Sequence, residues 1–296
     1  MSREHISASS LRGYLWISPA AAMLILVLAL PMIYSLKASF TASSLLSPGS
    51  EQDFVGWSNY WQTLTDPEYR MAVVTTVAYA ILAVSIELVL GTFVALMLNE
   101  TFFLTPVLRS AWIVPMVVTP AIVGLFWILL YDETHGIFNY ALVKLGFSPV
   151  PWLDVNHAFT SIVIMDVWQS TPFFALVMLA GLQSRNEEIL EAARVDGASP
   201  LQCFYYLTIS HLMPYMLIAS SFRIIAAMGD FDKIYMLTAG GPGLVTTTLS
   251  IQTYKVGFNT FDIGRTAAMA WLFLLIVLII SGPLICYLGK TSDAER

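Results

Sequence analysis

Six long apolar stretches constrain this chain more than any other feature of its sequence. A helix that crosses the hydrocarbon core of a bilayer needs about 20 predominantly apolar residues. Only 11% of the 296 residues are charged, and the mean hydropathy is +0.72. The sequence therefore predicts an all-α integral membrane protein with six transmembrane helices. We expect these helices at about residues 13–36, 71–98, 109–131, 159–182, 213–231 and 264–289.

The predicted helices also define the domain organisation. We expect one transmembrane domain over residues 13–289, with tails at 1–12 and 290–296 and a polar loop at 184–212. Six crossings place both tails on the same side of the membrane. Lys and Arg are divided almost evenly between the two sides, so the positive-inside rule does not orient the chain.

Motifs for catalysis, metals and nucleotides do not occur at usable spacings. Cys203 and Cys286 belong to no CxxC or Cys/His pattern, which gives no reason to expect a disulfide framework or a metal site. HExxH and GxSxG are absent from the sequence, so we expect no catalytic residues. The GKT at 289–291 lacks the first glycine of a phosphate-binding loop, because Leu284 stands there.

One polar segment, between the fourth and fifth apolar stretches, interrupts this pattern. Glu187 to Val195 predicts a short amphipathic helix, and Gly197 can end it by adopting a positive φ. Ser199 and Pro200 then supply an N-cap and a first helical residue for a second helix. Two interpretations stay open from these residues alone: an amphipathic loop on the membrane surface, or a docking element for another protein.

This segment carries a resemblance to a known family. Glu191-Ala192-Ala193, followed by Asp196-Gly197-Ala198, Phe204 and Pro214, resembles the EAA loop of the membrane subunits of bacterial ABC importers, in particular the carbohydrate-importer permeases. The family usually has a proline where Ser210 stands here. Other stretches, before and after this segment, are also similar to the family. They occur in the family's order along nearly the whole chain: PMIYSLKASF, FVGWSNY, VWQSTPFFALVMLAGL, FDKIYMLTAGGP and TTTLSIQTYKVGFNTFDIGRTAAMA.

The resemblance implies that this chain is one of several subunits of a transporter, each with its own task. This chain would pair with a second, related permease in the bacterial inner membrane, in contact with lipid and with both termini in the cytoplasm. Two copies of a cytoplasmic ATPase would carry ATP and Mg²⁺, so this chain would bind no cofactor and catalyse no reaction. A solute-binding protein would deliver the substrate, and nucleic acid would play no part. The residues implied to couple to the ATPase are Glu191, Ala192, Ala193, Asp196 and Gly197.

The resemblance also implies a substrate path for a sugar or a sugar derivative. Charges inside membrane helices are costly and usually face a cavity or a partner. Arg223 has two open interpretations: it neutralises Asp166 or Asp230 within the bundle, or it meets an anionic group such as a sulfonate or a phosphate on a glycoside. Glu87 is expected to be a buried structural carboxylate. The implied substrate-binding positions are Met116, Asp166, Gln169, Ser170, Phe173, Arg223, Ala227, Asp230 and Asp232.

A second class of function also fits carboxylates within the membrane. An ion-coupled secondary transporter of a small polar solute would place Glu87, Asp166 and Asp230 there too, although such proteins normally show repeated halves or broken helices. The two classes differ in their energy source, because a secondary transporter works without an ATPase. The sequence favours the ATP-driven importer through its EAA-like segment.

Overall fold

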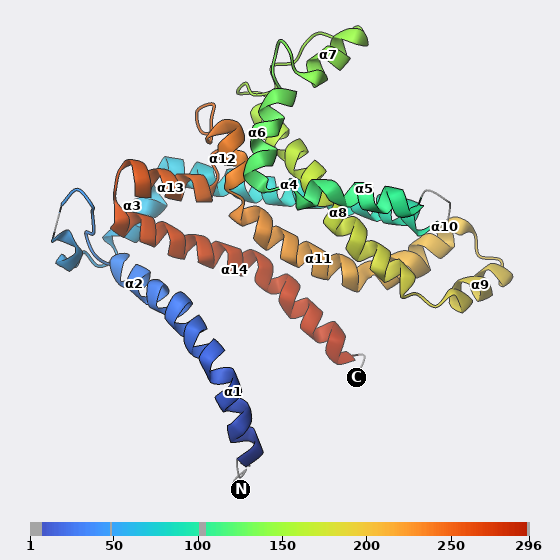
Figure 1. Cartoon of the computed structure of the whole chain (residues 1–296), viewed down its shortest axis with the longest axis horizontal. Helices are drawn as coiled ribbons and strands as arrows, with labels where there is room; N and C mark the ends of the chain where they lie inside the picture. The colour runs from blue at the N-terminus through green and yellow to red at the C-terminus, as the bar shows by residue number, and fades with distance from the viewer. Residues whose placement is uncertain (1–7, 48, 101–104, 295–296) are drawn as a thin grey trace. The chain divides into compact units, whose positions relative to one another are not determined.

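The computed structural model describes residues 8–47, 49–100 and 105–294, and these residues form helices with two isolated β-bridges (Figure 1). The predicted tails at 1–12 and 290–296 lie partly outside the described residues. The α-helices are α1 Ala8–Leu24, α2 Leu30–Ala38, α3 Ser58–Thr65, α4 Pro67–Asn99, α5 Thr105–Val117, α6 Pro120–Leu130, α7 Ile137–Lys144, α8 Ala158–Gln183, α9 Glu187–Val195, α10 Pro200–Gln202, α11 Ser210–Gly229, α12 Asp232–Thr238, α13 Leu249–Asn259 and α14 Ile263–Ala294. A π-helical segment, Ile25–Ala29, joins α1 to α2, and another, Cys203–Ile209, joins α10 to α11.

Five of the described helical segments are long and apolar enough to cross a membrane. They correspond to five of the six predicted helices, and their bounds are Trp16–Ala38, Pro67–Asn99, Ala158–Gln183, Pro200–Gly229 and Ile263–Pro283. The fourth of these begins earlier than the predicted 213–231, because the second helix of the polar segment continues into it without a break. The all-helical fold class is confirmed.

The third predicted helix is not one straight crossing. The stretch expected at 109–131 is divided into α5 and α6, which meet at an angle of 98°. Proline explains the break, because Pro120 has no N–H for a helical hydrogen bond and disfavours helical backbone at Thr119. Thr119 accordingly has an extended ψ of 131°. If the bent pair counts as one crossing, the described chain has up to six.

The described residues form two compact units, and the three boundaries between them fall between α3 and α4, within α13 and within α14. The smaller unit comprises the described parts of 1–65 and 253–272. Its loops are joined by Asn59, whose side-chain amide donates to the backbone oxygens of Ser39 and Thr41 at 2.9 Å each. The segment Trp16–Ala38 exposes most of its apolar side chains within this chain, as a helix surrounded by lipid or by a partner subunit would.

The larger unit contains the described parts of 66–252 and 273–296. Its core is built chiefly from α4 and α8, with α6, α11 and α12 packed around them. Figure 1 shows α6 turning sharply away from α5 towards α7, while α8 runs from beside α6 to the α9 segment. Large side chains such as Tyr79, Phe174 and Met178 are fully buried where these helices meet.

Gly91 allows α4 and α8 to approach closely. A Cβ at Gly91 would collide with Phe174 and with the backbone of Ala175, whereas a Cβ at Gly282 of α14 would meet nothing within 4 Å. We expect Gly91→Ala to destabilise the protein by about 1–3 kcal/mol through overpacking. Gly282→Ala is the matched control and should leave stability unchanged or slightly raised. Thermal melting of the two variants in detergent would test this, and equal melting temperatures would contradict it.

Candidate functional site

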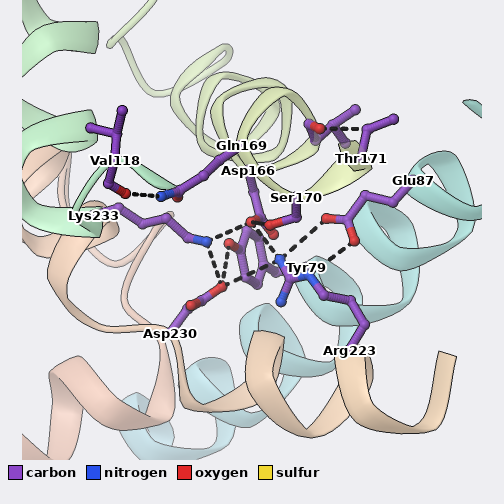
Figure 2. Close-up of polar contacts among 11 residues, drawn as sticks. Tyr79, Glu87, Val118, Asp166, Gln169, Ser170, Thr171, Arg223, Asp230 and Lys233 are labelled. Atoms are coloured by element: carbon purple, nitrogen blue, oxygen red, sulfur yellow. Dashed lines mark hydrogen bonds and ion pairs between the residues drawn. The ribbon is translucent and has the colours of Figure 1, made fainter. Parts of the chain in front are cut away.

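Six buried or largely buried polar side chains converge in the larger unit, and we call them the charge cluster (Figure 2). Four helical elements supply them: α4, α8, the end of α11 and the start of α12. On α4, Tyr79 and Glu87 lie eight residues apart, and they contact Asp230 and Arg223 respectively. The members of the charge cluster are Tyr79, Glu87, Asp166, Arg223, Asp230 and Lys233.

Arg223 lies at the centre of the charge cluster. Its Nε lies 2.9 Å from Glu87 Oε2, and its Nη2 lies 2.5 Å from Asp166 Oδ1. The same Nη2 lies 3.6 Å from Asp230 Oδ2. Of the two roles predicted for Arg223, the structure shows pairing with internal acids. A planar guanidinium suits this role because it presents several N–H donors in fixed directions.

Lys233 is the second cation of the charge cluster. Its Nζ lies 2.5 Å from Asp166 Oδ1 and 2.9 Å from Asp230 Oδ2. Tyr79 completes the surroundings of Asp230 by donating its hydroxyl hydrogen to Oδ2 at 3.1 Å. Asp166 therefore bridges the two cations, and Asp230 joins α11 to α12.

Burial makes these pairs interdependent. The side chains of Glu87 and Asp166 are fully buried, and those of Arg223 and Lys233 are 7% and 4% exposed. A buried charge is costly unless it is paired, and removing one partner of such a pair typically costs about 3–5 kcal/mol. The charge cluster thus fixes how four helical elements meet.

Two further predicted residues adjoin the cluster on α8. Ser170 Oγ donates to Asp166 Oδ1 at 3.1 Å, one helical turn away. Gln169 reaches in another direction, and its Nε2 donates to the backbone oxygen of Val118 at 3.0 Å, at the break between α5 and α6 (Figure 2). Gln169 therefore links α8 to the bent pair.

The other predicted substrate-binding positions are more dispersed. Ala227 is buried one turn after Arg223 on α11, and Phe173 packs half-buried against the core, edge-on to Phe174. Met116 is exposed on α5, before the break. Asp232 is exposed at the first position of α12. The described contacts therefore do not bring Met116, Phe173 or Asp232 into the charge cluster.

Sequence reasoning missed Lys233 and Tyr79. The apolar stretch ends near residue 231, so the sequence places Lys233 in an external loop, whereas in the structure it is buried on α12. A local signal for Lys233 existed: it follows Asp230 by three residues, a spacing at which opposite charges interact on a helix. Tyr79 has no comparable signal, because its contact with Asp230 spans 151 residues of sequence.

The polar segment forms a helical hairpin at the end of α8, which we call the EAA hairpin (residues 187–202). Helix α9 buries none of its residues in this chain, and Asn186 caps it by accepting a hydrogen bond from the N–H of Glu188. Gly197 has a φ of +83°, as predicted. Ser199 and Gln202 form a reciprocal capping box at the start of the second helix. Glu191, Ala192, Asp196 and Gly197 are exposed, and Ala193 is half-buried.

The connection between α6 and α8, which contains α7, is ordered around Asn139, and we call it the Asn139 loop. The Asn139 amide donates to the backbone oxygens of Glu133 and Val150, and its oxygen accepts from Val150 N–H and Trp152 Nε1. The neighbouring Asp132 accepts hydrogen bonds from the backbone N–H groups of His135 and Thr134, which lower the pKa of its carboxyl. A cavity of about 990 Å³ lies beside α7 in this loop.

Long apolar helices around a buried cluster of charges define a polytopic helical membrane protein, and the exposed hairpin at one end suits a subunit of a larger transporter. Residues 87–285 match the family described as "Binding-protein-dependent transport system inner membrane component". The chain belongs to this family, and it is a transport permease.

Curated relatives extend the match over most of the chain. It is 52% identical to the "Probable ABC transporter permease protein y4oQ" of Sinorhizobium fredii, over 94% of this chain and 90% of that protein. It is 38% identical to the trehalose/maltose transport system permease protein MalF of Thermococcus litoralis, over 90% of both. It is 33% identical to the sulfoquinovosyl glycerol transport system permease protein SmoG of Agrobacterium fabrum, over 88% and 84%.

A solved structure has the same fold. A chain in the crystal structure of a bacterial alginate ABC transporter, in complex with a pentasaccharide-bound periplasmic protein, superposes with a TM-score of 0.79. The superposition covers 92% of this chain and 91% of that one, at 19% sequence identity. At this identity, the likeness supports the fold.

Proposed function

We propose that this chain forms half of the translocation path of an ATP-driven importer for a sugar or a sugar derivative. The observation that carries the proposal is the EAA hairpin, a capped, exposed helical element in a chain that belongs to a binding-protein-dependent transport family. Relatives named for trehalose and maltose and for sulfoquinovosyl glycerol support a glycoside as the substrate.

The proposed assembly has four further members. A second, related permease pairs with this chain, two copies of a cytoplasmic ATPase bind ATP and Mg²⁺, and a solute-binding protein docks on the outer face. With the EAA hairpin on the ATPase, both termini are cytoplasmic. The Asn139 loop, at the other end of α8, then faces the solute-binding protein.

The proposed coupling is mechanical. ATP closes the ATPase dimer, and each ATPase carries the hairpin seated in it. The hairpin is joined to α8 by a short link and continues directly into α11, so its displacement moves two helices of the charge cluster. Movement of α8 against α11 would open the polar region between them to one side of the membrane and then to the other. Glu191, Ala192, Ala193, Asp196 and Gly197 are the proposed contacts.

The proposed substrate contacts are the polar side chains around the cluster. Sugar hydroxyls need donors and acceptors, which Asp166, Gln169, Ser170 and Asp230 supply, and an aromatic ring such as that of Phe173 can stack on the apolar face of a sugar. The remaining proposed positions are Met116, Arg223, Ala227 and Asp232.

Uptake by the assembled transporter tests this function. The chain is reconstituted in liposomes with its second permease, its ATPase and its solute-binding protein, and uptake of labelled trehalose, maltose and sn-glycerol-3-phosphate is measured. We expect uptake of at least one probe that requires ATP on the ATPase side. A disulfide crosslink from Ala192→Cys to the ATPase should form in the same sample. Uptake by the chain alone, driven by an ion gradient without nucleotide, would instead favour a secondary transporter.

A further inference from the structure

Side-chain contacts close the base of the EAA hairpin, between the end of α8 and the beginning of α11. The chain leaves α8 after Gln183 and enters α11 at Ser210, and these two segments lie side by side next to the hairpin (Figure 1). Five side chains make the contacts between them, and we call these residues the base clamp. The members of the base clamp are Ser184, Arg185, Thr208, His211 and Tyr215.

Arg185 and Thr208 form the contact nearest to the hairpin. Arg185 Nη1 donates to Thr208 Oγ1 at 2.9 Å, across 23 residues of sequence that include the whole hairpin. The Thr208 hydroxyl donates in turn to the backbone oxygen of Cys203 at 3.5 Å, inside the π-helical segment. Thr208 is only 5% exposed. A hydrogen bond from a charged donor is stronger than one between neutral groups, so this contact ties the beginning of the hairpin to its end.

A second set of contacts joins the two helices directly. Ser184 Oγ lies 2.8 Å from Tyr215 Oη and 3.3 Å from His211 Nε2. His211 Nε2 also donates to the backbone oxygen of Gly181 at 2.9 Å. Gly181 permits this close approach, because a Cβ there would lie 2.8 Å from Leu212 and 3.0 Å from the ring of Tyr215. The ends of α8 and α11 are therefore held against each other where the hairpin begins.

The backbone after the hairpin is continuous with α11. Ser210 has an N–H, which donates to the backbone oxygen of Leu207, whereas the proline that the family usually has at this place would lack it. The π-helical segment therefore runs into α11 as one helical element. A hairpin that is closed at its base and continuous with α11 moves together with both helices.

We propose that the base clamp transmits conformational change between the EAA hairpin and the helices α8 and α11. This inference rests on the proposed import function and assigns positioning residues to it, which act through the hairpin. A binding protein on the outer face can favour the closed ATPase dimer only through elements that connect the two and have two arrangements. The base clamp is such a connection, so stimulation of ATP hydrolysis by the solute-binding protein depends on it.

Thr208→Val tests the base clamp, since it removes the hydroxyl and keeps the shape of the side chain. The chain is reconstituted with its second permease and its ATPase, together with maltose, trehalose and sn-glycerol-3-phosphate. ATP hydrolysis is measured with and without the solute-binding protein, and the first rate is divided by the second to give the stimulation ratio. We expect Thr208→Val to bring this ratio close to one and to leave hydrolysis without the binding protein largely unchanged.

Matched variants distinguish the base clamp from a general disturbance of the helices. Thr208→Ser keeps the hydroxyl and should keep the native ratio. Thr171→Val removes another buried hydroxyl, one that donates within α8 to the backbone oxygen of Val167, and should also keep it. Arg185→Met should lower the ratio as Thr208→Val does, and the double variant should lower it no further, because both changes remove one contact. If Thr208→Val does not assemble, Tyr215→Phe takes its place with the same expected result.

Two kinds of outcome would overturn the inference. One is a native stimulation ratio in Thr208→Val, or an equal fall of the ratio in Thr208→Ser or Thr171→Val. The other is a fall of hydrolysis in the same proportion with and without the binding protein, which would show a purely structural role. Failure of the proposed function would be recognised in the native assembly itself, as hydrolysis that ignores the binding protein and uptake that does not depend on ATP.

Discussion

Arg223→Met should destabilise the protein by about 3–5 kcal/mol, the usual cost of leaving buried charges without their partner. The substitution leaves Glu87, Asp166 and Asp230 facing Lys233 alone. We expect a lower melting temperature in detergent, a lower yield of the assembled transporter and loss of uptake. Adding Glu87→Gln removes one of the uncompensated charges and should restore part of the stability, because the original excess of one carboxylate returns.

Two controls separate the pairing from the mere loss of a long cation. Lys144→Met removes an exposed cation of α7 and should change stability by less than about 0.5 kcal/mol. Arg223→Lys keeps the charge but lacks the planar group that spans three carboxylates, so its stability should fall between those of the native protein and Arg223→Met. A melting temperature for Arg223→Met equal to that of the native protein would mean that the charge cluster does not hold the helices together.

Local signals account for what the sequence predicted well. The EAA hairpin follows from residues within a few positions of one another: a glycine with positive φ, a serine cap and a proline at the first helical position. The apolar stretches likewise predict helices, because hydropathy over about 20 residues reflects the bilayer itself. These properties do not depend on which helices become neighbours.

The charge cluster depends on non-local contacts, which one sequence does not reveal. Arg223 lies 136 residues from Glu87 and 57 from Asp166, so a stripe of polar residues on a helix identifies the face but not its partners. The sequence left pairing and anion binding both open for Arg223, and the partners that it pairs with are seen only once α4, α8 and α11 are packed together. The bend at Thr119 was missed because the hydropathy of 109–131 outweighed the proline signal.

Ala192→Trp should strongly reduce transport while leaving the fold of the chain intact. Ala192 is exposed on α9, a helix that buries none of its residues in this chain. A large side chain at this position therefore costs the isolated subunit little, but it would prevent the close approach that small alanines allow. We expect uptake and ATP hydrolysis stimulated by the binding protein to fall by at least about tenfold, the equivalent of 1.4 kcal/mol or more of lost coupling.

The location of the lost contact can be tested with a matched substitution. Arg194 is also exposed and lies two residues further along α9, about 200° around the helix from Ala192. Arg194→Trp places the same indole ring on the other side of the helix and should retain most of the uptake. If both tryptophan variants lost transport equally, the effect would come from disturbance of the hairpin rather than from one docking face. If neither did, the ATPase would have to engage the permease elsewhere, and the movement of α8 and α11 would need another source.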